Sequence, residues 1–269
     1  IDINCVNNNS LLYNYVVTKK PPITKVFEQS SDNSEFLAEL GSEMKRDALA
    51  VIETELPFML PTEDTDVIIL EEFPSGGGYL GKWKDRHHIA LKYTFEETEK
   101  SGFKRSSSQS LTHELMHQKF AEVSGSNNLV GNPISEYLEN DKIVDLPDEE
   151  IISNILTIYS EAPEYKEDPD ETFVFWWAVT ESLSYLGEQY LGYETRPFRE
   201  KFERKDSIYL APVSNMVITF SESVEHSEIP SLMENILHIV ENEKDALDNT
   251  ELQREILKDP LKLLSLKKN

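Results

Sequence analysis

The chain has 269 residues, enough for one large domain or for one domain with an appendage. Its 26 basic and 50 acidic residues leave a net charge of −24, which repels nucleic acid and anionic membrane surfaces. Apolar runs fall far short of the ~20 residues that span a bilayer, and the one cysteine, Cys5, excludes an intrachain disulfide. We therefore expect a soluble protein with no transmembrane segment and no nucleic-acid partner.

Residue 1 is Ile and not Met, so a signal peptide can already have been removed. We expect secretion or export rather than residence in the cytoplasm. The composition predicts no particular oligomeric state.

The first hundred residues predict an irregular segment, a helix and two strands. Residues 1–30 are polar and turn-prone. Apolar residues at near-helical spacing predict a long helix over 34–56. The run "DVIILEEF" at 66–73 predicts a buried strand, and a second strand over 88–93 follows a glycine-rich turn. That turn lacks the Lys of a phosphate-binding loop and the glycine spacing of a dinucleotide fingerprint.

The rest of the chain is mainly helical in pattern. A helix over about 109–124 can be capped by Ser108 or Ser110 and stopped by Gly125. Further helices are predicted over 148–162, in the run "ETFVFWWAVTESLSYLGEQYLG", and from the Pro of "IPSLMENILHIVENEKDALD". This helical excess over two short strands favours an α+β fold.

The helix over 109–124 contains the sequence His113-Glu114-Leu115-Met116-His117. Composition predicts only about 0.02 accidental HExxH matches in a chain this long. On a helix the two histidines lie one turn apart, roughly 40° around the axis, so both imidazoles can bind one tetrahedral ion. Glu114 lies about 100° away, where it can act as a base for a metal-bound water. The alternative is that both histidines are core residues hydrogen-bonded to backbone.

A catalytic zinc usually takes three protein ligands, so another His, Asp or Glu is needed. The metzincin spacing fails, since Phe120 and Val123 occupy its Gly and His positions. Glu181 lies on a nearly all-apolar helix, where an unpaired carboxylate is costly and a metal ion is a suitable partner. Glu188, two turns further along, is the alternative ligand. Glu181 can also pair with a Lys or Arg, or reach solvent.

These residues resemble the gluzincin type of zincin metallopeptidase, with a more distant likeness to bacterial toxin and effector zinc proteases. The resemblance implies that His113, His117 and Glu181 bind one Zn²⁺ and that Glu114 is the general base. It also implies a small mixed sheet whose edge strand, "HHIALKY", borders the active-site cleft and pairs with an extended substrate. We expect this zincin-like domain over 31–225, with an N-terminal irregular segment over 1–30 and a C-terminal helical extension over 226–269 packed on it.

The predicted function is a zinc-dependent endopeptidase that acts on a protein or peptide substrate, and the charge of −24 favours a basic one. Adjacent residues on a strand face opposite sides, so His87 and His88 are not expected to chelate a metal together. The sequence leaves the oxyanion donor open among Tyr165, Tyr185, Tyr209 and His226. The alternatives are a catalytically inactive metal-binding module and a helical protein-interaction module.

Overall fold

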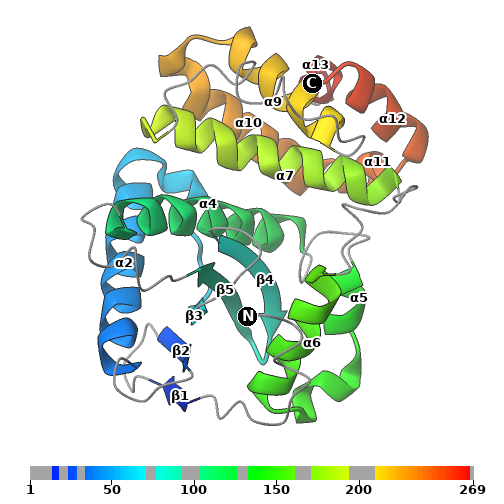
Figure 1. Cartoon of the computed structure of the whole chain (residues 1–269). Helices are drawn as coiled ribbons and strands as arrows, with labels where there is room; N and C mark the ends of the chain where they lie inside the picture. Colours follow the sequence, from blue (N-terminus) through cyan, green and yellow to red (C-terminus); the bar gives the residue numbers. More distant parts are fainter. Residues whose placement is uncertain are drawn as a thin grey trace.

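A five-stranded mixed sheet lies in the lower half of the computed structural model, between helices (Figure 1). The structure describes residues 14–17, 24–28, 34–70, 77–92, 103–125, 133–160, 171–193 and 210–266. The strands are β1 (Asn14–Val17), β2 (Thr24–Glu28), β3 (Thr65–Leu70), β4 (Gly77–Trp83) and β5 (Arg86–Lys92). Their order is β1-β2-β3-β5-β4, with β2, β3 and β5 parallel and the two outer strands antiparallel to their neighbours.

Three predictions about this sheet are wrong. The segment over 1–30, expected to be irregular, contributes β1 and β2. The expected edge strand over 88–93 is instead internal, because β5 pairs with β3 on one side and β4 on the other. The glycine-rich stretch expected to be a turn forms β4, which is the edge strand of the described sheet. The tight turn comes later, at Lys84 and Asp85, whose φ angles of 51° and 60° suit a two-residue hairpin.

Each face of the sheet is covered by helices, which explains why β3 is buried along its whole length. Helices α2 (Ser34–Glu55) and α4 (Phe103–Ser124) pack on one face, where they share a core with Val67, Ile89 and other strand residues. Helices α5 (Pro133–Leu138) and α6 (Asp148–Ser160) share a second core with the opposite face. The predicted helices over 34–56 and 148–162 are therefore confirmed.

Helix α4 begins earlier than expected, so Ser108 and Ser110 lie inside it and do not cap it. Its predicted end is confirmed, because Gly125 adopts a φ of +68°. On the side of α4 away from the sheet lies α7 (Glu171–Tyr190), followed by α9 (Leu210–Ser223), α10 (Ile229–Asn242), α11 (Lys244–Leu247), α12 (Thr250–Lys258) and α13 (Leu261–Leu264) (Figure 1). Short 3-10 turns lie at Pro57–Met59 (η1), Asp141–Asp145 (η2) and His226–Glu228 (η4).

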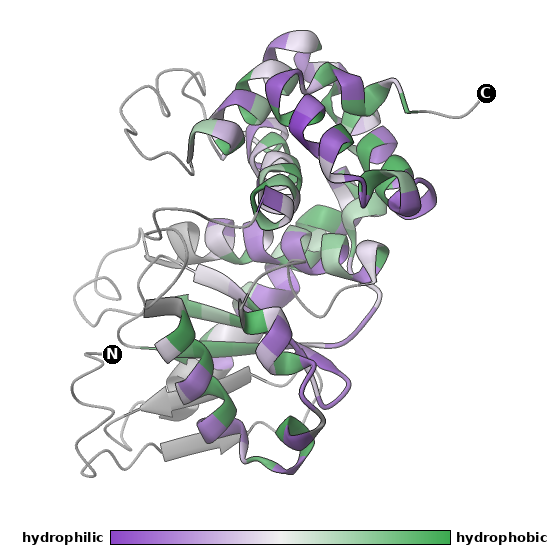
Figure 2. Cartoon of the chain, turned by 90° about the vertical axis from the view of Figure 1, so that its right-hand side faces the viewer, coloured by the Kyte–Doolittle hydropathy of each residue, from purple (hydrophilic) through white to green (hydrophobic). Residues whose placement is uncertain are grey.

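The C-terminal helices carry polar and apolar residues side by side (Figure 2), as expected for helices with one buried face. Apolar residues of α10 to α13, between Ile229 and Leu263, belong to the same apolar core as residues of α4 and α7. The protein is therefore an α+β fold, mostly helical with a small mixed sheet. In the described residues no helix has both the length and the apolar character that crossing a bilayer requires.

Candidate metal centre

The contact between α4 and α7 sets the position of the site. Met116 of α4 packs against Gly187 of α7, where a Cβ atom would overlap the Met116 thioether. Glycine therefore allows the two helices to approach closely at this point. The approach brings the polar faces of both helices together within an otherwise apolar core.

Three side chains converge between these helices. The Nε2 atoms of His113 and His117 lie 3.0 Å apart, and each lies 3.5 Å from one carboxylate oxygen of Glu181. Tetrahedral ligands with bonds of about 2.0 to 2.1 Å lie roughly 3.3 Å from one another, close to these spacings. The chemistry of the donors, two imidazoles and one carboxylate, also suits a zinc-type ion. His113, His117 and Glu181 thus form a group that could hold a metal ion, the one such group among the described residues.

Outer hydrogen bonds fix the orientation of both imidazole rings. Nδ1 of His113 lies 3.1 Å from Glu188 Oε1, and Nδ1 of His117 lies 2.8 Å from Thr180 Oγ1. With Nδ1–H donating outward, each Nε2 presents its lone pair to the centre. Glu188, the alternative third ligand, therefore lies behind His113, while Glu181 faces both inner nitrogens. Glu181 also accepts a hydrogen bond from Trp177 Nε1–H at 3.1 Å.

All three members of this group were predicted from the sequence, but the supporting residue Thr180 was not. Thr180 lies beside Glu181 on α7, and an isolated threonine in an apolar helix gives no signal that it bonds a histidine 63 residues away. Trp177 was recognisable only as the residue one turn before Glu181.

Glu114 is buried beside the group, with 8% of its surface exposed. Its Oε2 accepts a hydrogen bond of 2.7 Å from the backbone N–H of Tyr79 in edge strand β4. Burial raises the pKa of Glu114 to about 7, against the opposing charge of His113. Gly77 of the same strand also passes close by, since a Cβ at this position would lie 3.4 Å from Glu114 Cγ.

The charges in the site favour a cation at its centre. Burial alone would lower the pKa of His113, but hydrogen bonds and charges from Glu181 and Glu188 raise it well above its usual value. Burial lowers the pKa of His117 to about 4. Although burial opposes ionisation of Glu181, the charge of His117 and a hydrogen bond to His113 hold its pKa at about 2. One positive charge beside the ionised Glu181 carboxylate is thus the stable arrangement, and a metal ion can supply that charge.

Of the two oxyanion candidates that the structure describes, Tyr185 lies nearer to the group. Its ring centroid is 5.1 Å from that of His113, in an edge-to-face arrangement. His226 instead stacks on Tyr190 at the end of α7, with ring centroids 5.4 Å apart. Tyr165 and Tyr209 lie outside the described residues.

His87 and His88 take no part in the group. His88 stacks on Trp83 with ring centroids 3.3 Å apart, on the α5 and α6 side of the sheet. His87 bonds to Tyr79 on the α4 side. The prediction that these neighbours face opposite sides is confirmed.

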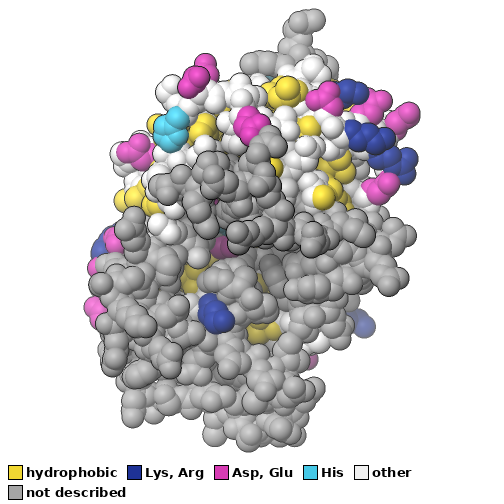
Figure 3. Space-filling view, turned by 45° about the horizontal axis from the view of Figure 1, so that its top comes forward, with side chains coloured by type: hydrophobic (Ala, Val, Ile, Leu, Met, Phe, Trp, Pro, Cys, Tyr) yellow, Lys and Arg dark blue, Asp and Glu magenta, His cyan; other side chains and the backbone are white. Residues whose placement is uncertain are grey.

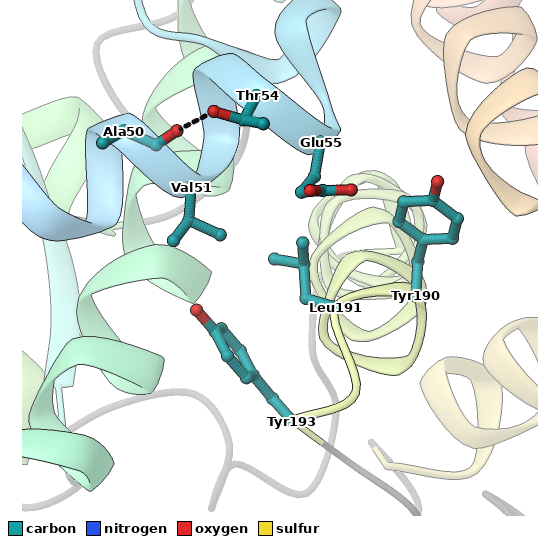
Figure 4. A pocket seen from close by; sticks show the side chains of 7 residues that line it. All are labelled: Ala50, Val51, Thr54, Glu55, Tyr190, Leu191 and Tyr193. Atoms are coloured by element: carbon teal, nitrogen blue, oxygen red, sulfur yellow. Dashed lines mark hydrogen bonds between the residues drawn. The ribbon is translucent and has the colours of Figure 1, made fainter.

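A pocket of about 540 Å³ lies apart from the metal centre, where the ends of α2 and α7 meet (Figure 4). It contains neither the three grouped residues nor Glu114. Its lining is formed by Ala50, Val51, Thr54, Glu55, Tyr190, Leu191 and Tyr193.

Comparisons with known proteins identify no relative. No protein-family model matches the chain, and neither the curated proteins nor the solved structures include a match.

Proposed function

We propose that the protein is a zinc-dependent endopeptidase of the zincin type. The observation that supports this most strongly is the convergence of His113 Nε2, His117 Nε2 and the Glu181 carboxylate at tetrahedral spacing. A second buried carboxylate, Glu114, lies beside them next to an edge strand. The fold alone does not support the proposal, because one fold serves many functions.

His113, His117 and Glu181 would hold the zinc ion. When bound, zinc acidifies a water molecule and polarises the scissile carbonyl group. Glu114 accepts a proton from the attacking water and donates it to the leaving amine. Tyr185 is the donor that we assign to the developing oxyanion, because its ring packs edge-to-face against the ring of His113.

The substrate class follows from the strand beside Glu114. Edge strand β4 has one neighbour in the described sheet, so its other side can pair with an extended peptide. Backbone pairing of this kind accepts many sequences and leaves specificity to side-chain pockets. We therefore propose a protein or peptide substrate.

One observation favours a second function, that of a catalytically inactive metal-binding protein. One carboxylate oxygen of Glu114 accepts a hydrogen bond from the Tyr79 amide, as a structural carboxylate would. The two functions share a metal and differ only in turnover.

Metal analysis and a cleavage assay on Glu114→Gln separate these functions. The variant keeps all three ligands but loses the base, so zinc should remain bound while cleavage of unfolded protein substrates falls by about 10²- to 10⁴-fold. Absence of zinc from the wild-type protein after zinc repletion would overturn both functions. Bound zinc without cleavage by the wild type would leave the inactive module.

A further inference from the structure

Between Gly77 and Gly81, edge strand β4 carries only two side chains. Tyr79 joins the core shared by α4 and α7, whereas Leu80 joins the core beneath α5 and α6. The other three positions are glycines. Tyr79 is therefore the one side chain that anchors this stretch on the side that faces Glu114.

The Tyr79 ring is in turn held by a chain of hydrogen bonds. Its hydroxyl lies 2.7 Å from His87 Nδ1, and His87 Nε2 lies 3.1 Å from Glu63 Oε2. Lys82 pairs with the same carboxylate. Tyr79 and His87 are 7% and 1% exposed, so water does not replace the bond between them, whereas the Glu63 side chain is 42% exposed. Burial lowers the pKa of His87, so the ring is neutral, donates Nε2–H to Glu63 and accepts the Tyr79 O–H at Nδ1.

The backbone around Tyr79 depends on this anchor more than a regular strand would. The pairing of β4 with β5 shifts register between Tyr79 and Gly81, and Gly81 adopts a φ of 110°. In the described sheet no strand pairs with the opposite side of β4. The Tyr79 N–H that orients Glu114 is thus fixed in large part by the Tyr79 side chain.

We propose that Glu63, His87 and Tyr79 form a positioning chain for Glu114, in which the side chain of Tyr79 holds the edge-strand amide that orients the Glu114 carboxylate. Its catalytic consequence rests on the proposed peptidase function. The three residues act through the amide and do not contact the substrate, so they are positioning residues.

Tyr79→Phe tests the chain because it removes the hydroxyl and keeps both the ring and the amide. Loss of this hydrogen bond should lower kcat by about 2- to 10-fold, with KM and zinc affinity unchanged. In a Glu114→Asp background, where the shorter side chain withdraws from the amide, Tyr79→Phe should cause almost no further loss. The matched control is Tyr137→Phe, which removes a hydroxyl bonded to Asn154 in the other core and should leave kcat unchanged.

Equal losses from Tyr79→Phe in both backgrounds would overturn the proposal, because a general structural defect does not depend on Glu114. An unchanged kcat in Tyr79→Phe, or the same loss in Tyr137→Phe, would also overturn it.

A second measurement needs no activity. In the zinc-free protein, Glu114→Gln should shift the Tyr79 amide proton resonance, since it replaces a carboxylate acceptor by a neutral one. Glu63→Gln and His87→Phe should shift that resonance in the same direction, and Tyr137→Phe should leave it in place. A resonance that responds to Glu114→Gln alone would overturn the positioning chain. Failure of the wild type to cleave peptides with zinc bound would instead overturn the proposed function.

Discussion

Gly187 of α7 faces Met116 of α4 without room for a methyl group between them. Met116 is the fourth residue of the HExxH motif, so this contact lies between His113 and His117 along the helix. Substitution at position 187 should therefore affect the spacing of the metal ligands as well as core packing.

Gly187→Ala is expected to lower the free energy of unfolding. Overpacking costs about 1 to 3 kcal/mol, against a gain in helix propensity of up to about 1 kcal/mol. Zinc affinity should fall as well, because α7 carries Glu181. Denaturant unfolding and zinc titration would measure both effects. The cost should be smaller in a Met116→Ala background, and an equal cost there would show that the contact does not cause it.

The two acidic residues of α7 should differ in their effects on zinc binding. Glu181→Ala removes a ligand and should abolish tight binding. Glu188→Ala removes the outer partner of His113 and should weaken binding by about 10- to 100-fold. Competition with a chelator of known affinity would rank the two. Equal affinity in Glu188→Ala and wild type would contradict the orienting role of Glu188, and a stronger loss in Glu188→Ala would reassign the ligand.

Thr180 gives a milder test of the same geometry. Thr180→Val keeps the shape of the side chain and removes the hydroxyl bonded to His117 Nδ1. We expect weaker zinc binding with little change in secondary structure, checked by titration and circular dichroism. Thr157→Val is the control, since its hydroxyl donates to the Ser153 carbonyl within α6, a helix that does not belong to the metal centre. If both variants bound zinc like the wild type, the Thr180 bond would have no orienting role.

The burial of Lys45 should make the stability of the protein depend on pH. It is 4% exposed, and its Nζ donates to the Thr65 carbonyl. Burial, partly offset by the charge of Asp66, lowers its pKa from 10.5 to about 8. Between pH 8 and pH 10.5 the unfolded chain binds more protons at Lys45 than the folded protein does. The destabilisation by the buried Lys45 charge is therefore complete below pH 8 and decreases as the pH rises to 10.5.

Lys45→Met removes the buried charge. The difference in free energy of unfolding between this variant and the wild type, in favour of the variant, should therefore shrink by about 3 kcal/mol between pH 7 and pH 10.5. Denaturant unfolding across this range measures the difference. Lys142→Met, at an exposed position, is the control. A difference that stays constant with pH would refute the prediction.

Charge also predicts a preference among substrates. The basic residues near β4 are already paired: Lys82 with Glu63, Lys84 with Asp148, and Arg86 with Asp64 and Asp66. Acidic side chains are intermingled with basic ones on the helical face as well (Figure 3). The net charge of −24 should therefore speed encounter with basic peptides.

The rate advantage of basic over acidic peptides should fall as salt shortens the Debye length from about 30 Å at 0.01 M to about 8 Å at physiological ionic strength. Measurement of kcat/KM for matched basic and acidic peptides across this range would check it. Rates that ignore both peptide charge and salt would show that the charge has no steering role.

The sequence predicted those parts of the site that depend on one local element. His113, Glu114 and His117 lie on a single helix, whose period determines where the side chains point. Glu181 was predictable because a carboxylate in an apolar helix needs a partner. The roles of Thr180 and Glu188 depend on how α4 packs against α7, and no local pattern records this packing.

The sheet was harder to predict for the same reason. Glycines have low strand propensity, so the stretch that forms β4 has the composition of a turn. In the folded protein Gly77 forms part of a strand that passes close to Glu114, which lies 37 positions later in the chain. The internal position of β5 depends on its parallel pairing with β3, which only the assembled sheet determines.

The three residues of the candidate metal group come from two helices, and His117 and Glu181 are 64 positions apart in the chain. An ion bound there would act as a reversible cross-link that closes this loop. Unlike a disulfide, the ion would be released on unfolding, so it would add stability through its binding free energy and not by constraining the unfolded chain. The single cysteine of this chain cannot form an intrachain disulfide, so a bound ion would be the cross-link between these two helices. Folding and metal supply would be linked, since the free energy of unfolding would rise with the concentration of free zinc.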